Sequence, residues 1–368
     1  MQITEVELVP LALPFARPYA SARGTLEHRE IGVLRLSTDQ GLVGLGEAVP
    51  LSLRGGADLA DIDRNLRKVA RRLRKAGIAD FSGPEPTRAA VGAFVYVAAG
   101  RRLPAPAKAA LEMALFDLAG KASGRPLWSL LGAQSCEPVR CNATLVSGSP
   151  DEVAADAKRW AQRGFDTFKL KLGVGDDLAQ VRAVRAAVGT EATIRLDANA
   201  AWSLEEARGI VRLVEPLGIE LVEQPVAGLE QMTEITASTN LLIAADESVA
   251  SGKDAQRAAR VRACDLATVK LAKVGGIGEA NGIAGHLPIY LSSALDGPLG
   301  IAAAAHAAQA LDFAGAAADL AHGLATQLLF SQTIAGRKCR LEGDKLILPE
   351  GPGLGVELDD EALAALRI

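Results

Sequence analysis

The chain has 368 residues, of which 49% are hydrophobic and 23% are charged, and a chain of this length and composition buries a core without disulfide or metal staples. Forty basic and 44 acidic residues give a formal net charge of −4, and aromatic residues make up only 4%. These values exclude a disordered protein, a disulfide-rich mini-protein and a collagen-like repeat. They also disfavour binding to nucleic acid or to an anionic membrane surface.

The four cysteines and four histidines are scattered along the chain. No C-x-x-C spacing occurs and no histidine pair lies near a cysteine, so neither a zinc site nor a disulfide framework is expected. The first residues alternate between polar and apolar, without the basic and apolar regions of a signal peptide. No stretch reaches about 18 consecutive apolar residues. The sequence therefore predicts a cytoplasmic protein without a membrane span.

The N-terminal third predicts strands followed by helices. Residues 3–15 alternate in polarity, and residues 29–49 are typical of a hairpin around Thr38-Asp39-Gln40-Gly41. Residues 58–77 carry apolar side chains at helical spacing with basic residues between them. Residues 104–124 predict a second, alanine-rich helix with prolines near its start and glycines near its end.

From about residue 138 to 315, short β-branched runs alternate with helical stretches. The predicted strands are 139–145, 167–172, 193–199, 219–225, 242–246, 266–271 and 289–295, with a weaker eighth near 312–318. This alternation indicates parallel β/α units. Seven or eight such units favour a closed barrel, and an open doubly wound sheet is the alternative.

The C-terminal ends of parallel barrel strands meet at one edge, which is where a barrel places its active site. Lys169 and Lys171 lie two residues apart near the end of the second strand, so both side chains point the same way. If they point inward, Phe168, Leu170 and Leu172 pack outward against the helices. The alternative is a pair of exposed lysines on an edge strand.

The next three predicted strands each end in one carboxylate: Asp197, Glu223 and Asp246. Any one of these acids could instead cap a helix or lie in a loop, but capping does not explain acids at the same level of three successive strands. Three converging carboxylates repel one another unless a hard cation lies between them. The pattern therefore predicts an octahedral Mg²⁺ that keeps places for substrate oxygens.

The sixth strand ends at Lys270, and a lysine buried at a strand end is rarely structural. Because the second and sixth strands lie far apart around a barrel, their lysines would approach the centre from opposite sides and reach either face of one carbon. Partial burial and the ammonium of Lys169 would lower the pKa of Lys171 from the usual ~10.4. Lys273 is expected to be exposed on the following turn.

The end of the seventh strand offers hydroxyl groups. Ser292 and Ser293 are placed to donate hydrogen bonds to a substrate carboxylate. Asp296 precedes a Gly-Pro pair and is expected to cap the next helix, where His306 is expected to be packed. The glycine-rich residues 275–280 do not have the spacing of a P-loop or a dinucleotide-binding fingerprint.

As a set, these strand-end motifs resemble the enolase superfamily, and within it the muconate-lactonizing subgroup. The motifs are K-x-K at 169–171, D-x-N at 197–199, E-Q-P at 223–225, D-E-S at 246–248, and Lys270 followed by a G-G turn. The hairpin GLVGLGEAVP, the helix KAALEMALFDLAGKASGRPLWSLLG and the closing PGLGVEL extend the resemblance over nearly the whole chain.

The resemblance implies an α/β fold with a modified (β/α)7β TIM barrel and an N-terminal α+β capping domain. The capping domain would span residues 1–131 and the barrel residues 132–325, with residues 326–368 returning to the capping domain. Small carboxylates are the implied substrates, and a homo-oligomer is compatible with the family.

The resemblance also assigns roles to the strand-end residues. Asp197, Glu223 and Asp246 would hold Mg²⁺, with Mn²⁺ as the alternative ion. Lys171 and Lys270 would form the acid/base pair, and Lys169 would be the electrostatic helper. In this superfamily the metal stabilises an enediolate while a lysine or histidine takes the proton α to a carboxylate.

The reaction within the subgroup depends on the substrate. YLSSALDGPLGIAAAA, followed by HGLATQLLF, is similar to o-succinylbenzoate synthases of menaquinone synthesis, so dehydration of that type is the first expectation. Asp319-Leu320-Ala321 lacks the second acid of the D-x-D motif of dipeptide epimerases, and Asp319 is a loose counterpart of the cycloisomerase glutamate.

The alternatives are a muconate or chloromuconate cycloisomerase, an N-acylamino acid racemase or dipeptide epimerase, and a barrel without catalysis that serves as a binding module. A sugar-acid dehydratase of the mandelate racemase subgroup would have a His-Asp base instead of Lys270.

Specificity in the family comes from two N-terminal loops and the last strand ends. Arg23 and Arg54, in the turn-rich segments 18–25 and 50–56, are candidates for bidentate binding of a second carboxylate. In the alternative interpretation both segments are plain turns and both arginines are solvated. The other predicted substrate-binding residues are Asn199, Ser292, Ser293 and Asp319. These segments offer two arginines and no clear pair of acids for an ammonium group, which favours a dianionic substrate over a dipeptide.

Overall fold

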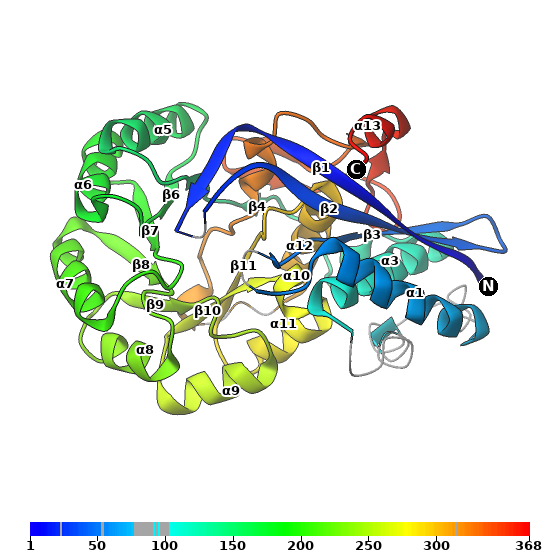
Figure 1. Cartoon of the computed structure of the whole chain (residues 1–368), viewed down its shortest axis with the longest axis horizontal. Helices are drawn as coiled ribbons and strands as arrows, with labels where there is room; N and C mark the ends of the chain where they lie inside the picture. Colours follow the sequence, from blue (N-terminus) through cyan, green and yellow to red (C-terminus); the bar gives the residue numbers. More distant parts are fainter. Residues whose placement is uncertain are drawn as a thin grey trace.

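The computed structural model places a barrel beside a smaller α+β unit (Figure 1). It describes residues 1–22, 24–52, 55–76, 91–92, 95, 103–311, 313 and 315–368. Cys136, Cys141, Cys264 and Cys339 are all free thiols. Among the described residues, no helix is both long enough and apolar enough to cross a membrane.

The N-terminal unit is a three-stranded antiparallel sheet packed against helices. Its strands, in the order β1-β2-β3, are β1 (Ile3–Ser21), β2 (Gly24–Thr38) and β3 (Val43–Ala48). The predicted hairpin joins β2 to β3, and the Gly41 amide donates to the Thr38 carbonyl across 3.2 Å. The helices are α1 (Leu59–Ala76), α3 (Ala105–Ser123) and α4 (Leu127–Leu130). The β1–β2 ribbon reaches from this unit across the barrel (Figure 1).

Seven parallel strands form the wall of the barrel, in the spatial order β11-β10-β9-β8-β7-β6-β5. They are β5 (Ala143–Leu145), β6 (Thr167–Lys171), β7 (Thr193–Asp197), β8 (Ile219–Glu223), β9 (Leu242–Ala245), β10 (Leu266–Lys270) and β11 (Ile289–Ser292). Each lies within or overlaps one of the predicted strands, because short β-branched runs separated by helical stretches are the signature of parallel β/α units.

A two-residue segment closes the barrel between β11 and the start of β5. His322 forms a parallel bridge with Cys141, and Gly323 forms one with Ser292. The Gly323 amide donates to the Leu291 carbonyl across 2.8 Å. The expected eighth strand near 312–318 is wrong, because residues 315–317 form a 3-10 turn and the closing contacts come later in the chain.

The helices surround the strands, as Figure 1 shows. They are α5 (Pro150–Gln162), α6 (Asp177–Val188), α7 (Leu204–Val214), α8 (Leu229–Thr236), α9 (Gly252–Val261), α10 (Leu271–Val274), α11 (Ile277–Ala284) and α12 (Pro298–Ala308). Ser149 and Ser203 begin α5 and α7 with complete capping boxes, in which the serine oxygen and a glutamate three residues later satisfy otherwise unpaired backbone amides.

The last residues contact the N-terminal unit. The Ala12 amide donates to the Leu366 carbonyl across 2.9 Å, and Phe15 stacks on Phe330 with ring centroids 4.8 Å apart. Two small sheets precede the final helix α13 (Asp360–Ala365). One joins β4 (Val139–Arg140), β13 (Arg340–Glu342) and β14 (Lys345–Ile347), and the other joins β12 (Ala335–Arg337) and β15 (Glu357–Leu358).

Candidate active site

The charged residues at the strand ends form one layer inside the barrel. Lys171 pairs with Asp197, and Asp197 with Glu223, in the parallel registers of β6, β7 and β8. Asp246 directly follows β9, and Lys270 ends β10. All five are buried, so the lysines face inward and not outward as on an edge strand.

Lysines of β6 bond to the acids of the next two strands. Nζ of Lys169 lies 2.6 Å from Oε2 of Glu223 and 2.9 Å from Oδ2 of Asp197. Nζ of Lys171 lies 2.5 Å from the same Asp197 oxygen and 3.1 Å from Oδ1 of Asn199. The two lysines therefore share one carboxylate, which offsets the cost of burying their charges.

Asp246 is held by two further lysines. Lys270 bonds to its Oδ2 at 2.5 Å, and Lys273 bonds to its Oδ1 at 2.9 Å. Lys273 also donates to the Thr268 carbonyl and is only 7% exposed, so the expectation that it is a surface residue is wrong. The Gln224 side chain accepts hydrogen bonds from the Asp246 and Ser248 amides and fixes the start of this loop.

The carboxylates of this layer raise the pKa values of Lys169 and Lys171. Burial lowers the pKa of Lys171, but the Asp197 carboxylate outweighs it and leaves the pKa raised. The pKa of Lys169 lies well above its usual value for the same reason, with Glu223 as a second partner. The expected lowering for Lys171 is therefore wrong, because that argument counted burial and the second ammonium and omitted the carboxylates bonded to both lysines.

The three acids have the chemistry of a divalent-cation site. Oε1 of Glu223 is buried and accepts no hydrogen bond, while its Oε2 accepts one from the Tyr290 hydroxyl. Burial and the neighbouring Asp197 raise the pKa of Glu223, which is the repulsion a cation would relieve. No three acidic, histidine or cysteine side chains within the described ranges are gathered closely enough to hold a metal ion as they stand. The shared Mg²⁺ site of Asp197, Glu223 and Asp246 stays a prediction.

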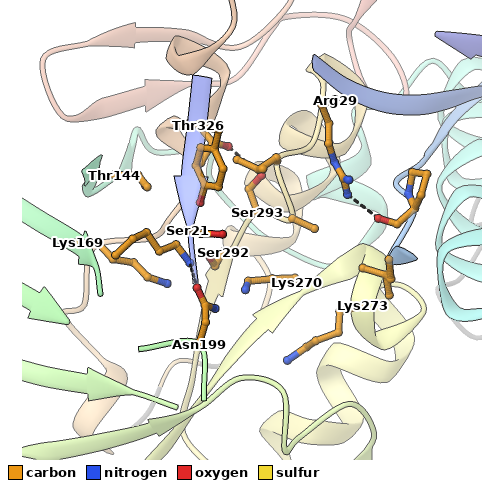
Figure 2. Close-up of a pocket in the computed structure, with 16 residues that line it drawn as sticks. Ser21, Arg29, Thr144, Lys169, Asn199, Lys270, Lys273, Ser292, Ser293 and Thr326 are labelled. Atoms are coloured by element: carbon orange, nitrogen blue, oxygen red, sulfur yellow. Dashed lines mark hydrogen bonds between the residues drawn. The ribbon is translucent and has the colours of Figure 1, made fainter. Parts of the chain in front are cut away.

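A pocket opens above the ion pairs, between the barrel and the N-terminal unit. Its charged lining residues in the described part of the chain are all cations: Arg29, Lys169, Lys171, Lys270 and Lys273. Figure 2 shows Lys169 on one side of the pocket and Lys270 with Lys273 on the other. The lining therefore favours an anion, and the carboxylates that pair with the four lysines lie beneath it.

Arg29 is a lining residue that sequence reasoning missed. It lies on β2, and its Nη2 donates to the Pro50 carbonyl across 2.5 Å (Figure 2). It is buried on the same face of the strand as Ile31 and Val33. The sequence did contain a signal. Arg29, Ile31 and Val33 are spaced two residues apart, so their side chains lie on the same face of β2, and a face with two apolar residues is expected to be buried.

The other predicted substrate residues have different outcomes. Asn199, Ser292 and Ser293 all line the pocket. Asp319 is not among the lining residues; it is exposed and precedes the closing segment by three residues. The structure therefore gives no support to its role as a counterpart of a strand-eight acid.

The two predicted loops also reach the site. Tyr19 and Ser21 line the pocket from the end of β1, so the first segment is the tip of the β1–β2 ribbon and not a loop. Pro50 and Leu51 line the pocket from the second segment. Arg23 and Arg54, the predicted carboxylate-binding residues of these segments, lie outside the described residues.

Known protein families account for most of the chain. Residues 3–132 match the mandelate racemase / muconate lactonizing enzyme N-terminal domain, and residues 152–362 match the enolase C-terminal domain-like family. The L-Ala-D/L-Glu epimerase of Bacillus subtilis is 33% identical over 373 residues, covering 97% of each chain.

Solved structures are similar over the full length. The muconate lactonizing enzyme from Pseudomonas fluorescens, complexed with muconolactone, has a TM-score of 0.91 at 30% identity, covering 100% of this chain and 99% of its own. The dipeptide epimerase from Enterococcus faecalis, complexed with Mg and the dipeptide L-Leu-L-Tyr, has a TM-score of 0.87 at 30% identity, covering 97% and 100%. The chain belongs to the enolase superfamily, in its mandelate racemase and muconate lactonizing enzyme group.

Proposed function

We propose that the protein is a cycloisomerase-type enzyme that acts on a small dianionic carboxylic acid. The superfamily chemistry is removal of the proton α to a carboxylate, and the proposal concerns the substrate and the fate of the enediolate. The observation that carries it is the pocket lining, in which the charged side chains of the described residues are all cations. A second carboxylate on the substrate would be attracted by these cations, whereas a free ammonium group would find no acidic partner among them.

The roles of the lysines follow from where they enter the pocket. Lys171 and Lys270 end strands that are separated by three others, β7, β8 and β9, so one planar substrate carbon between them presents one face to each. In the lactone-opening direction, Lys171 takes the α-proton in its amine form, which requires that its ion pair with Asp197 be released. The electron pair of that C–H bond then expels the ring oxygen as a carboxylate. In the lactone-forming direction, the same lysine returns the proton to carbon.

Lys270 and Lys169 act through their positive charges. Lys270 as an ammonium stabilises the enediolate from the opposite face, and Lys169 holds Asp197 and Glu223 in place. A divalent cation held by Asp197, Glu223 and Asp246 would supply positive charge to the substrate carboxylate. The Mg in the Enterococcus faecalis epimerase structure supports this assignment.

A dipeptide epimerase is the second candidate, and it is favoured by the 33% identity to the Bacillus subtilis epimerase. Epimerisation would use the same two lysines, one to remove the proton and one to return it on the other face. The first expectation from the sequence, an o-succinylbenzoate synthase, is not supported by the relatives described above, which are epimerases and a muconate lactonizing enzyme.

The test is a comparison of kcat/KM with Mg²⁺ for muconate, an N-succinyl amino acid, the succinyl cyclohexadiene acid of the synthase reaction and the dipeptide L-Ala-L-Glu. We expect muconate to exceed the dipeptide by about tenfold or more, equivalent to about 1.4 kcal/mol of transition-state binding. If the N-succinyl amino acid or the cyclohexadiene acid is preferred to muconate by that margin, the dianionic substrate class stands and the cycloisomerase reaction is overturned. A dipeptide preferred by that margin would overturn the proposed substrate class and leave the superfamily chemistry intact.

A further inference from the structure

Two barrel helices have their N-terminal amides capped by carboxylates of the N-terminal unit. α11 and α12 begin after Gly276 and Gly297, and neither glycine offers a side chain to cap its helix. The Glu112 carboxylate, on α3, accepts hydrogen bonds from the Ile277 and Gly278 amides. The Glu47 carboxylate, on β3, accepts one from the Gly297 amide at 2.6 Å. Each carboxylate satisfies amides that the helix itself leaves unpaired.

Glu47 is enclosed where it meets α12. It is 1% exposed, and its Oε2 has no hydrogen-bond partner. A Cβ added to Gly297 would lie 2.7 Å from that oxygen, and one added to Gly300 would lie 2.9 Å from Oε1. A Cβ at Gly297 would therefore displace the carboxylate, and one at Gly300 would also lie 2.7 Å from Cβ of Asp296.

The turn that Glu47 holds is part of the pocket wall. Ser293, Ala294 and Leu295 line the pocket, and Leu295 has a backbone φ of 65°. A bulky residue in this left-handed region is strained by about 1–2 kcal/mol, so its surroundings must hold it there. Leu295 therefore keeps its place only as long as the contacts around the turn persist.

Short hydrogen bonds hold the rest of the turn. The Asp296 amide donates to Oγ of Ser293 at 2.8 Å, and the Ala294 amide donates to the Asp296 carboxylate at 2.7 Å. Asp296 thus closes the turn and does not cap α12, contrary to the sequence-based expectation. Thr326 donates to Ser293 at 2.8 Å. The Glu47 bond to Gly297 joins this turn directly to the N-terminal unit.

We propose that Glu47 is a positioning residue that sets the Ser293–Gly297 turn, and with it the pocket wall that meets the substrate. The N-terminal unit thereby shapes the pocket wall that the barrel contributes, in addition to the wall that it contributes itself. Substrate fit depends on Glu47 although Glu47 itself does not line the pocket. The part concerning substrate fit rests on the proposed function, whereas the part concerning the turn does not.

The test uses the full chain with two substitutions of Glu47. Glu47→Met removes the acceptor at similar volume, and Glu47→Gln keeps an acceptor oxygen. Hydrogen–deuterium exchange of residues 293–300 is read by mass spectrometry. We expect exchange about tenfold faster in Glu47→Met and near wild type in Glu47→Gln, because a helix amide loses its partner only in the former. Unchanged exchange in Glu47→Met overturns the proposal.

The second readout separates positioning from general stability. With the preferred substrate we expect Glu47→Met to raise KM about tenfold and to change kcat by less than about threefold. The control is Asp117→Leu, since Asp117 is equally buried on α3 and accepts from the Leu45 and Leu354 amides away from the pocket. Asp117→Leu should lower stability without moving KM.

The outcomes remain distinct. Faster exchange with an unchanged KM overturns the role in substrate fit. If the wild type turns over none of the tested acids, the proposed function fails and the exchange measurement still decides the role of Glu47. If Glu47→Met does not fold, Gly297→Ala replaces it, because the added Cβ would displace the carboxylate.

Discussion

Nζ of Lys171 lies 2.5 Å from Oδ2 of Asp197, at the same level of neighbouring strands. The lysine predicted as a base and the acid predicted as a metal ligand are thus bonded to each other. Burial opposes ionisation of Asp197, but Lys169 and Lys171 outweigh it and hold the pKa of that carboxyl well below its usual range. Asp197 is consequently a permanent anion, available to a lysine or to a divalent cation.

The first prediction concerns this acid. Asp197→Asn removes one negative charge from the site and should weaken Mg²⁺ binding and lower turnover together, the latter by about 10²-fold or more, because enediolate charge is less well stabilised. Calorimetric titration with Mg²⁺ and steady-state kinetics measure the two effects. Chelation should abolish wild-type activity, and added Mg²⁺ should restore it. Asp151→Asn, at an exposed position of α5, is the control. Unchanged Mg²⁺ affinity in Asp197→Asn would remove this acid from the metal site.

The second prediction separates the two lysines. A one-base reaction exchanges the substrate α-proton with solvent deuterium from one face only, through Lys171. Lys171→Ala should then abolish exchange, while Lys270→Ala should lower turnover by about 10²–10⁴-fold through loss of enediolate stabilisation. NMR of the substrate in D₂O records both effects, with Lys158→Ala on the exposed face of α5 as the control. Exchange from both faces in the wild type would contradict the one-base reaction and favour an epimerase.

The third prediction concerns Lys273, which is 7% exposed and bonds to Asp246 and to the Thr268 carbonyl. Lys273→Met leaves the Asp246 oxygen without this partner, so the free energy of unfolding should fall by about 3 kcal/mol. Urea denaturation measures it, and Lys253→Met, at an exposed position of α9, should change stability by less than about 0.5 kcal/mol. Equal stability of the two variants would mean that the Asp246 pairing contributes nothing net.

The local sequence pattern was enough to predict that the charged residues at the strand ends form one layer. A side chain in a strand alternates between two faces, and the parallel arrangement brings all strand ends to one edge. Lys169 and Lys171 therefore had to share a direction, and the acids of β7 and β8 had to lie beside them. The same rules could not find the closing segment, because His322 and Gly323 form single bridges without a β-branched run.

The residues that were missed depend on contacts between distant segments. Lys273 looked like a turn residue, yet the short helix α10 (Leu271–Val274) folds it back onto Asp246. Arg29 belongs to the N-terminal unit and enters the pocket only because β2 crosses the barrel. Asp296 precedes a helix, as a cap would, but the capping carboxylate comes from Glu47, almost 250 positions earlier in the chain. Sequence spacing carries no information on such packing.

The last prediction follows from the burial of Glu47. Burial, together with the nearby charge of Asp296, raises the pKa of Glu47 from 4.5 to about 8. Between these values the folded protein keeps a proton that the unfolded chain has released. The free energy of unfolding should therefore fall as pH rises through this window, by up to about 1.4 kcal/mol per pH unit for one proton.

The glutamine of Glu47→Gln cannot ionise, so the free energy of unfolding of this variant lacks the fall with pH that Glu47 causes. Relative to the wild type, the variant should therefore become more stable as pH rises. Urea denaturation at pH 5, 6, 7 and 8 gives the difference between the two proteins at each pH. Glu205→Gln, at an exposed position of α7, should follow the wild type throughout. A difference between Glu47→Gln and wild type that stays constant from pH 5 to pH 8 would mean that Glu47 holds no proton in the folded state. Arg29, whose charge lowers the pKa of Asp296, would then be sufficient to keep both carboxylates ionised against α12.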